Sequence, residues 1–226
     1  MPGTLYIVAT PIGNLKDLTF RAKEILESVG AIACEDTRVT VKLLNAYGIK
    51  KPLFAVHQHA TANRISLIVE RLNKGEDIAY VSDAGTPGVN DPGGKLVEEA
   101  MGYGVKVEPI PGASALTAVI SVCGFPMERY TYLGFAPHKK GRQTFFRELA
   151  ENTVAAVFFE STHRLLKTLE ALKDNLHPKR MVCVGRELTK MHETVYRGTS
   201  EQVLEQVKST SDKGEAVLVI APSSYA

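Results

Sequence analysis

Residues 82–94 are the part of the chain best equipped to hold a ligand. They read Ser-Asp-Ala-Gly-Thr-Pro-Gly-Val-Asn-Asp-Pro-Gly-Gly and follow an apolar segment directly. Glycines let a ligand approach the backbone closely, and prolines fix the direction of the chain. Asp83 can accept hydrogen bonds from ligand hydroxyls or amines. We expect a binding loop here, and the alternative is a rigid loop capped by Asp91.

Two further loops share this character. Residues 10–15 read Thr-Pro-Ile-Gly-Asn-Leu, and residues 109–115 read Pro-Ile-Pro-Gly-Ala-Ser-Ala. Small residues that lead into a helix expose backbone N–H groups to an anion, although Ser114 can equally be a simple N-cap. The P-loop and Rossmann glycine patterns are absent from the sequence, which argues against a kinase, a GTPase or an ordinary dehydrogenase. We expect the three loops to converge on one polar ligand.

Ionisable residues gather at four other places. Residues 34–38 read Cys-Glu-Asp-Thr-Arg, and residues 138–142 read His-Lys-Lys-Gly-Arg; residues 159–164 and 185–193 read Phe-Glu-Ser-Thr-His-Arg and Gly-Arg-Glu-Leu-Thr-Lys-Met-His-Glu. Each has a plainer interpretation as a helix cap or a charged surface loop. His57-Gln58-His59 lacks a third ligand at metal-binding spacing, so we expect no metal site.

The elements that must position these residues alternate between strand and helix patterns. In the first half, the expected strands are Leu5–Ala9, Ala31–Cys34, Leu53–Val56, Ile78–Val81 and Val105–Pro109. Helical patterns lie between them and after the last strand. This order predicts a parallel sheet with helices on both faces. In such sheets ligands bind at the carboxyl ends of the strands, where the three loops lie.

A break at residues 123–126, Cys-Gly-Phe-Pro, predicts the domain boundary, with an α/β domain over residues 1–122 and a second over residues 123–226. Two neighbouring strands around Val184 and Tyr196 lack a long helix between them. They predict a hairpin, and therefore a mixed sheet in the second domain. The overall fold class is α/β with two α/β/α domains.

Composition narrows the class of protein. The chain has 226 residues, 44% hydrophobic and 23% charged, which is typical of a soluble globular protein. The longest apolar runs are too short to cross a bilayer, and we see no signal peptide. Three cysteines without a C-x-x-C pair predict reduced thiols in a cytoplasmic protein. A net charge of +2 permits an anionic partner without requiring one.

The motifs together resemble the tetrapyrrole methylase family of S-adenosylmethionine-dependent methyltransferases. The resemblance is carried by residues 5–15, 34–38, 82–88, 111–115, 159–161, 185–190 and 213–215 and spans essentially the whole chain. Within the family, the chain resembles the members that methylate small-subunit (16S) ribosomal RNA. It implies two α/β domains with S-adenosylmethionine in the cleft between them, a cytidine ribose 2′-oxygen as acceptor, and a homodimer. Such members often carry a further helical domain beyond the position of Ala221, and Thr162 stands where they commonly have proline.

The resemblance also implies roles for residues. The cofactor contacts it implies are Pro11, Ile12, Gly13, Asp83, Gly85, Thr86, Ala113, Ser114, Phe159, Glu160 and Pro222. A ribose hydroxyl needs a general base, for which the candidates are Glu187, Lys190, Glu35 and Asp36. We rank Glu187 and Lys190 slightly ahead because of their ionic surroundings. The candidate RNA contacts are Arg38, Arg164 and Arg186.

Two alternatives stay open from the sequence. One is a methyltransferase of the same fold that acts on a tetrapyrrole or on a modified protein residue. The other is a non-catalytic module that binds RNA or a nucleotide. The second alternative leaves the three glycine-rich loops without a purpose.

Overall fold

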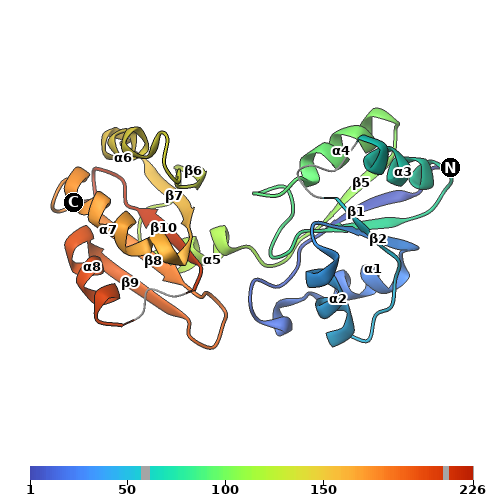
Figure 1. Ribbon diagram of the computed structural model, residues 1–226, viewed down its shortest axis with the longest axis horizontal. Coiled ribbons are helices and arrows are strands. Elements are labelled where there is room, and N and C mark those ends of the chain that lie inside the picture. The colour runs from blue at the N-terminus through green and yellow to red at the C-terminus, as the bar shows by residue number, and fades with distance from the viewer. Residues whose placement is uncertain (57–61, 211–213, 226) are drawn as a thin grey trace. The chain divides into compact units, whose positions relative to one another are not determined.

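The computed structural model describes residues 1–56, 62–210 and 214–225 (Figure 1). The histidine pair at 57 and 59 and Lys213 lie outside these residues. The chain divides into two compact units, Met1–Ser114 and Ala115–Ala226. Among the described residues, no helix combines the length and the apolar character needed to span a membrane.

The first unit is built on a five-stranded parallel sheet. Its strands are β1 (Thr4–Val8), β2 (Ala31–Cys34), β3 (Leu53–Ala55), β4 (Ile78–Val81) and β5 (Lys106–Ile110), in the order β3-β2-β4-β1-β5. Strands β2 and β4 are buried along their whole length. Their continuous apolar runs are what a sheet covered on both faces requires. The predicted parallel sheet is confirmed.

Helices cover both faces of this sheet, as Figure 1 shows. The helices are α1 (Phe20–Ser28), α2 (Thr37–Ala46), α3 (Ala62–Asn73) and α4 (Gly93–Gly102), with a short 3-10 turn at Leu15–Asp17 before α1. Leu26 of α1 and Leu44 of α2 pack on one face with Ile32. Leu72 of α3 and Leu96 of α4 pack on the other with Tyr80.

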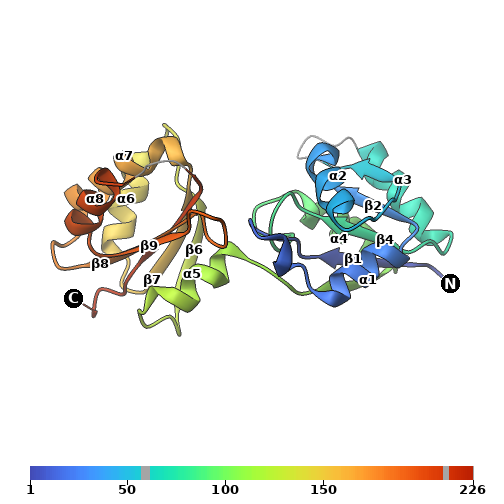
Figure 2. The same ribbon diagram turned by 90° about the horizontal axis from the view of Figure 1, so that it is seen from below.

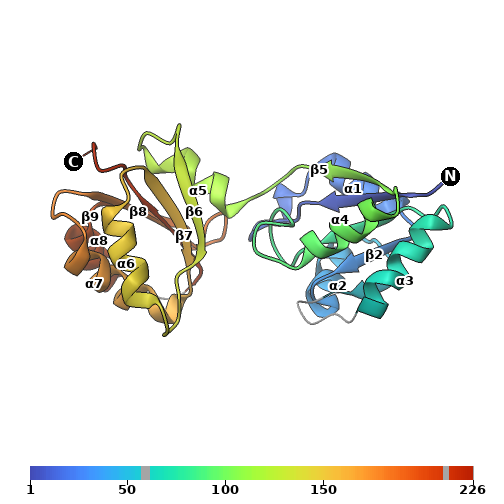
Figure 3. The ribbon, with the colours of Figure 1, turned by 90° about the horizontal axis from the view of Figure 1, so that it is seen from above.

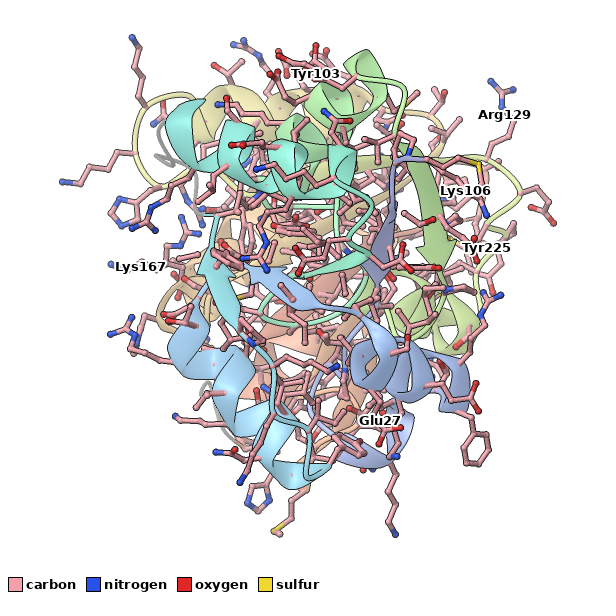
Figure 4. All side chains as sticks on the ribbon, turned by 90° about the vertical axis from the view of Figure 1, so that its right-hand side faces the viewer. Glu27, Tyr103, Lys106, Arg129, Lys167 and Tyr225 are labelled. Carbon is pink, nitrogen blue, oxygen red and sulfur yellow. The ribbon has the colours of Figure 1, made fainter. Side chains whose placement is uncertain are left out.

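The edge strand β5 carries charge along its exposed side. Lys106 pairs with Glu108 of the same strand at 2.8 Å, and Figure 4 shows Lys106 at the side of the sheet. Charged side chains on an edge strand discourage pairing with a strand of another chain.

The crossover pattern creates a binding position at the carboxyl ends of β1 and β4. These strands are neighbours, yet the chain leaves β1 for α1 on one face and leaves β4 for α4 on the other. A crevice forms where connections of adjacent strands diverge in this way. The loops 10–15 and 82–94 flank that position.

The second unit contains a mixed five-stranded sheet. Its strands are β6 (Tyr130–Phe135), β7 (Ala155–Glu160), β8 (Met181–Arg186), β9 (Thr194–Thr199) and β10 (Ala216–Ile220), in the order β6-β7-β10-β8-β9. Strands β6 and β7 are parallel, and every other neighbouring pair is antiparallel. The predicted β8–β9 hairpin and the predicted mixed sheet are both confirmed.

Three helices pack on one face of the second sheet and one on the other (Figure 2). On the first face lie α6 (Arg142–Glu151), α7 (Leu165–Asn175), which follows a 3-10 turn at Thr162–Arg164, and α8 (Ser200–Lys208). Helix α5 (Ala115–Cys123) packs on β8, β9 and β10.

The boundary between the units lies before helix α5, not after it as the sequence predicts. The sequence predicts the boundary between residues 122 and 123, whereas the compact units meet at Ser114 and Ala115. The reason is packing: Val119 of this apolar helix is buried and lies against Gly185 of β8. Figure 3 shows α5 beside the second sheet.

A buried arginine secures the end of the second sheet opposite the β8–β9 turn. Arg180, just before β8, is 2% exposed and donates to five backbone carbonyls, those of Leu149, Ala150, Asn152, Val154 and Ala221. Burial lowers the pKa of its guanidinium. Arg180 therefore ties the end of α6 to the end of β10.

We predict that Arg180→Met strongly destabilises the second unit. Methionine fills part of the space but leaves buried carbonyls without donors, at about 1–3 kcal/mol for each unsatisfied group. Urea unfolding followed by circular dichroism measures the change. The control is Arg147→Met on the exposed side of α6, which should stay within about 0.5 kcal/mol of the parent chain. Equal stability of the two variants would contradict the assigned role.

Candidate active site

Two hydrogen bonds join the loops that follow β1 and β4. The Thr10 N–H donates to the Gly85 carbonyl, and the Gly85 N–H donates to the Thr10 carbonyl, both at 3.0 Å. The Thr10 hydroxyl donates to the Ser82 carbonyl at 3.3 Å. Gly85 has a φ of +81°, a backbone conformation that glycine adopts more readily than residues with a Cβ atom. This bridge fixes the two loops at the diverging crossovers.

The loop after β5 joins the same cluster. The Thr86 hydroxyl donates to the Ala113 carbonyl at 3.0 Å. A Cβ atom at Gly85 would lie 3.2 Å from Cγ2 of Ile12 and 3.7 Å from the Ala113 oxygen. Ile12, Gly85 and Ala113 therefore meet, so the three loops come together; a ligand that they share stays a prediction. Pro11, Gly13 and Ser114 lie in the same loop segments.

Carboxylates concentrate beside this cluster, at the ends of β2 and β4. The Asp36 N–H donates to Oδ1 of Asp83 at 3.0 Å. Burial, followed by the charge of Asp83, raises the pKa of Glu35. Burial also raises the pKa of Asp83, and the charge of Asp36 adds to it. This end of the sheet therefore favours a positively charged ligand group.

Asp36 differs from its two neighbours. It caps α2 by accepting from the Arg38 N–H at 2.8 Å, and its carboxylate pairs with the Arg38 guanidinium at 2.6 Å. These contacts lower the pKa of Asp36 to about 2. The capping interpretation is thus correct for Asp36, which is too acidic to take a proton near neutral pH.

Asp91 shapes the glycine-rich loop from within. Its carboxylate accepts from the N–H groups of Gly88 at 2.6 Å and Gly93 at 2.9 Å, and from the Tyr80 hydroxyl at 3.0 Å. The sequence indicates Asp91 as a cap but not its tie to Tyr80. Asp83 makes none of these loop contacts. The two aspartates of the loop thus have different tasks.

In the second unit, Glu187 and Lys190 form an ionic turn between β8 and β9. The Lys190 ammonium lies 2.9 Å from Glu187 and 2.9 Å from Glu215, and the Glu215 N–H donates to Glu187 at 2.7 Å. Glu187 and Thr189 have φ values of +52° and +66°. Backbone strain of this kind marks functional segments as well as tight turns.

The two ionic partners in this turn stabilise each other's charged form. Burial raises the pKa of Glu187, but the hydrogen bonds from Lys190 and Glu215 outweigh it, so the net shift is downward. Burial lowers the pKa of Lys190, but hydrogen bonds to Glu187 and Glu215 outweigh it, so the net shift is upward. A more acidic carboxyl accepts a proton weakly, and a lysine that holds its own proton more tightly has no free electron pair, so both are poor bases at neutral pH.

Glu160 is an internal group. Its side chain is 0% exposed and pairs with Arg164 at 2.6 Å and Arg142 at 3.2 Å. It also accepts from the Thr168 hydroxyl and the Ser161 N–H. The neighbouring Phe159 is half-buried and packs against Tyr132 and Phe135. Phe159, unlike Glu160, presents a side chain that a ligand can reach.

The structure separates Pro222 from Phe159 and Glu160. In the antiparallel pairing of β10 with β7, Ala216 lies opposite Glu160 and Ile220 opposite Ala156. Pro222 follows β10 at the far end, six residues beyond Ala216, which is about 20 Å along a strand. One adenosine does not span that distance, so the three residues are not brought together.

The three candidate arginines also differ in exposure. The Arg38 side chain is 86% exposed. Arg164 is 18% exposed and pairs with Glu160, and the buried Arg186 donates to the His192 carbonyl and the Thr194 hydroxyl. Only Arg38 of these three stands in the solvent where a phosphate would meet it.

Comparisons with known proteins agree with this architecture. Residues 4–204 match the family model described as Tetrapyrrole (Corrin/Porphyrin) Methylases. The protein named ribosomal RNA small subunit methyltransferase I in Pasteurella multocida is 44% identical over 223 residues, 97% of this chain and 79% of that protein. Its namesake in Thermotoga maritima is 41% identical over 219 residues, 97% of this chain and 98% of that protein.

Solved structures show the same fold at low identity. A diphthine synthase aligns with a TM-score of 0.73 at 17% identity, covering 97% of this chain and 90% of that one. A cobalt precorrin-4 methyltransferase aligns with a TM-score of 0.69 at 15% identity, covering 96% of this chain and 94% of that one.

We predict that Gly85→Ala damages the loop cluster far more than Gly88→Ala. Both glycines have positive φ, +81° and +87°, so alanine adds similar backbone strain. At Gly85 the new Cβ meets Ile12 and Ala113, whereas a Cβ at Gly88 has no atom of the described residues within 4 Å. Thermal unfolding and calorimetric titration with S-adenosylmethionine measure the effect. Affinity should fall about tenfold or more for Gly85→Ala alone; equal losses in both variants would refute the contact.

Proposed function

The chain belongs to the tetrapyrrole (corrin/porphyrin) methylase family and is a methyltransferase, and we propose that it transfers methyl from S-adenosylmethionine to small-subunit ribosomal RNA. The observation that carries the proposal is identity of 40–45% with relatives of that name over 96–97% of this chain. The finer proposal, a cytidine 2′-oxygen as acceptor, rests on the motif resemblance. The same resemblance supports a cytoplasmic homodimer.

The residues at the ends of β1, β2, β4 and β5 fit the proposed cofactor. When bound, S-adenosylmethionine supplies a methyl group on a positively charged sulfonium and also carries an ammonium group. Burial raises the pKa of both Glu35 and Asp83; the charge of Asp83 adds to the shift of Glu35, and the charge of Asp36 adds to that of Asp83. A nearby cation relieves both. The absent Cβ at Gly85 lets the Ile12 side chain and the Ala113 carbonyl approach the loop closely. Pro11, Gly13, Thr86 and Ser114 complete the proposed set.

We propose Glu35 as the general base. Its raised pKa makes the Glu35 carboxylate a stronger base than that of Asp36. Among the described residues, Glu35 also has no ion pair like those that hold Glu187 and Lys190. In the reaction the new carbon–oxygen bond forms as the carbon–sulfur bond breaks, and Glu35 takes the ribose hydroxyl proton. The other three candidates keep roles in charge and positioning.

Two proposed contacts remain outside the loop cluster. Phe159 offers its half-buried ring to the adenosine, while Glu160 acts through its internal ion pairs and Pro222 stands apart from both. Arg38 offers an exposed guanidinium to an RNA phosphate. Arg164 and Arg186 support the backbone around them.

We predict that the protein transfers labelled methyl from S-adenosylmethionine to small ribosomal subunits that lack their own modification. Free RNA and a tetrapyrrole serve as parallel acceptors. The label should appear in RNA at one nucleotide whose linkage resists alkaline cleavage, because a methylated 2′-oxygen cannot attack the adjacent phosphate. Label in the tetrapyrrole alone would overturn the proposed acceptor.

We predict that Glu35→Gln lowers kcat by about 10²–10⁴ at saturating cofactor. The parent enzyme needs the deprotonated carboxyl, so its kcat/KM, which reports the free enzyme, should fall as the pH decreases through a pKa above the usual glutamate value of about 4.3. The variant should lose this limb of the pH profile. Glu187→Gln is the matched control and should keep the limb. Full activity of Glu35→Gln would remove Glu35 as the base.

A further inference from the structure

A buried ionic cluster lies under the loop that joins β6 to α6. Glu160, Arg142, Arg164 and Thr168 form it, with the Thr168 hydroxyl accepting from Arg142 at 2.6 Å and donating to Glu160 at 2.5 Å. Both guanidiniums pair with the same carboxylate. The cluster as defined therefore carries a net positive charge beneath the surface.

The cluster holds the loop from below. Arg142 donates to the Pro137 carbonyl at 3.1 Å, and Arg164 donates to the Ala136 carbonyl at 3.2 Å. The next residues along the chain, His138, Lys139 and Lys140, are exposed. Two ammonium groups thus stand above a buried cluster of the same sign, which strengthens the attraction for an anion.

Aromatic rings adjoin this loop on the edge strand β6. Phe135, three residues before His138, is 50% exposed, and its ring lies 5.4 Å from that of Phe159. Tyr132 packs edge-on against Phe159 at 5.5 Å, and Tyr130 at the start of β6 is 41% exposed. An exposed ring supported by a second ring offers a flat face to a third.

We propose that residues 135–140, named here the β6–α6 surface, bind a single-stranded segment of the RNA substrate. Lys139 and Lys140 contact phosphates, and a base stacks on Phe135. The combination of cationic side chains with an exposed aromatic ring is how proteins hold single strands without reading sequence. An acidic protein segment would use the lysines but not the ring. This proposal rests on the proposed function, because it assigns a docking surface for that acceptor.

The β6–α6 surface lies at the same end of the second sheet as the Glu187–Lys190 turn. Glu160, Arg186 and Ala216 lie at the same end of the second sheet, since Ala216 pairs with both of the others. The β6–α6 surface follows β6, which runs parallel to β7 and ends beside Glu160. The surface and the Glu187–Lys190 turn therefore belong to one end of one sheet.

The test compares Lys139→Ala/Lys140→Ala with Lys173→Ala/Lys179→Ala. The control pair removes the same charge at the end of α7 and before β8, at the opposite end of the sheet. The probe is a twelve-nucleotide oligocytidylate, titrated at several salt concentrations. Loss of two phosphate contacts should lower the slope of log K against log salt by about 1.4. The control should keep the parent slope.

Phe135→Ala tests the stacking contact, with Phe135→Leu to keep the packing on Phe159. We expect oligocytidylate affinity to fall about tenfold in both variants, because leucine has no aromatic face. Methyl transfer by Phe135→Leu, which keeps the packing on Phe159, should show a raised KM for RNA with kcat and S-adenosylmethionine affinity unchanged. Thermal unfolding verifies that the variants fold.

The outcomes separate this proposal from the proposed function. If the parent chain methylates RNA but the lysine variant keeps its salt slope and KM, the β6–α6 surface is not the docking site. If the parent chain binds S-adenosylmethionine but labels no RNA, the proposed acceptor fails. In that case an unchanged oligocytidylate slope also overturns the docking site, whereas a lowered slope supports nucleic-acid binding at the surface.

Discussion

The paired hydrogen bonds between Thr10 and Gly85 are the constraint on which the candidate site depends. They join loops that leave neighbouring parallel strands toward opposite faces of the sheet. The pairing requires Gly85 to adopt a φ of +81°, and the missing side chain keeps Ile12 and Ala113 close. Without this bridge, three loops would still end at one edge of the sheet, but their ligand-facing atoms would have no fixed spacing. A transfer reaction that relies on positioning needs that spacing.

Strand direction explains which of the residues singled out from the sequence lie together in the structure and which do not. In the first unit every strand is parallel, so the residues that follow the strands lie at the same end of the sheet. Ile12, Gly85 and Ala113 come together there as expected. In the second unit β10 is antiparallel to β7, so Pro222, which follows β10, lies at the opposite end of the sheet from Glu160. Apolar runs predict that a strand exists, but not which way it runs. The direction depends on pairing with residues far away in the chain.

A local sequence pattern likewise does not show which partner an ionisable side chain will have in the folded chain. The ionisable residues of the Glu187 turn and the Phe-Glu-Ser-Thr-His-Arg motif suggest chemistry, yet Glu187 and Lys190 hold each other, and Glu160 and Arg164 are internal. Asp36 caps the helix, as its position in the sequence indicates, but the pKa of Glu35 is raised by burial and by the charge of Asp83, 48 positions away. The contribution of Asp83 follows from the sheet order, which places β2 beside β4, and the burial follows from the packing of the whole unit.

The two units use charge in opposite ways, and each suits one of the two proposed substrates. In the first unit, Asp36 and Asp83 repel each other, and a bound cation relieves that repulsion. This excess of negative charge favours a methyl donor with a positively charged sulfonium. The Arg142–Glu160–Arg164 cluster has the reverse excess and supports a basic loop, which favours a polyanion. An apolar cluster could pack β7 against α6 and α7 equally well, and buried ion pairs are weak sources of stability. An apolar cluster could not, however, donate hydrogen bonds to the Ala136 and Pro137 carbonyls. The function of these buried charges is therefore to hold the loop in place.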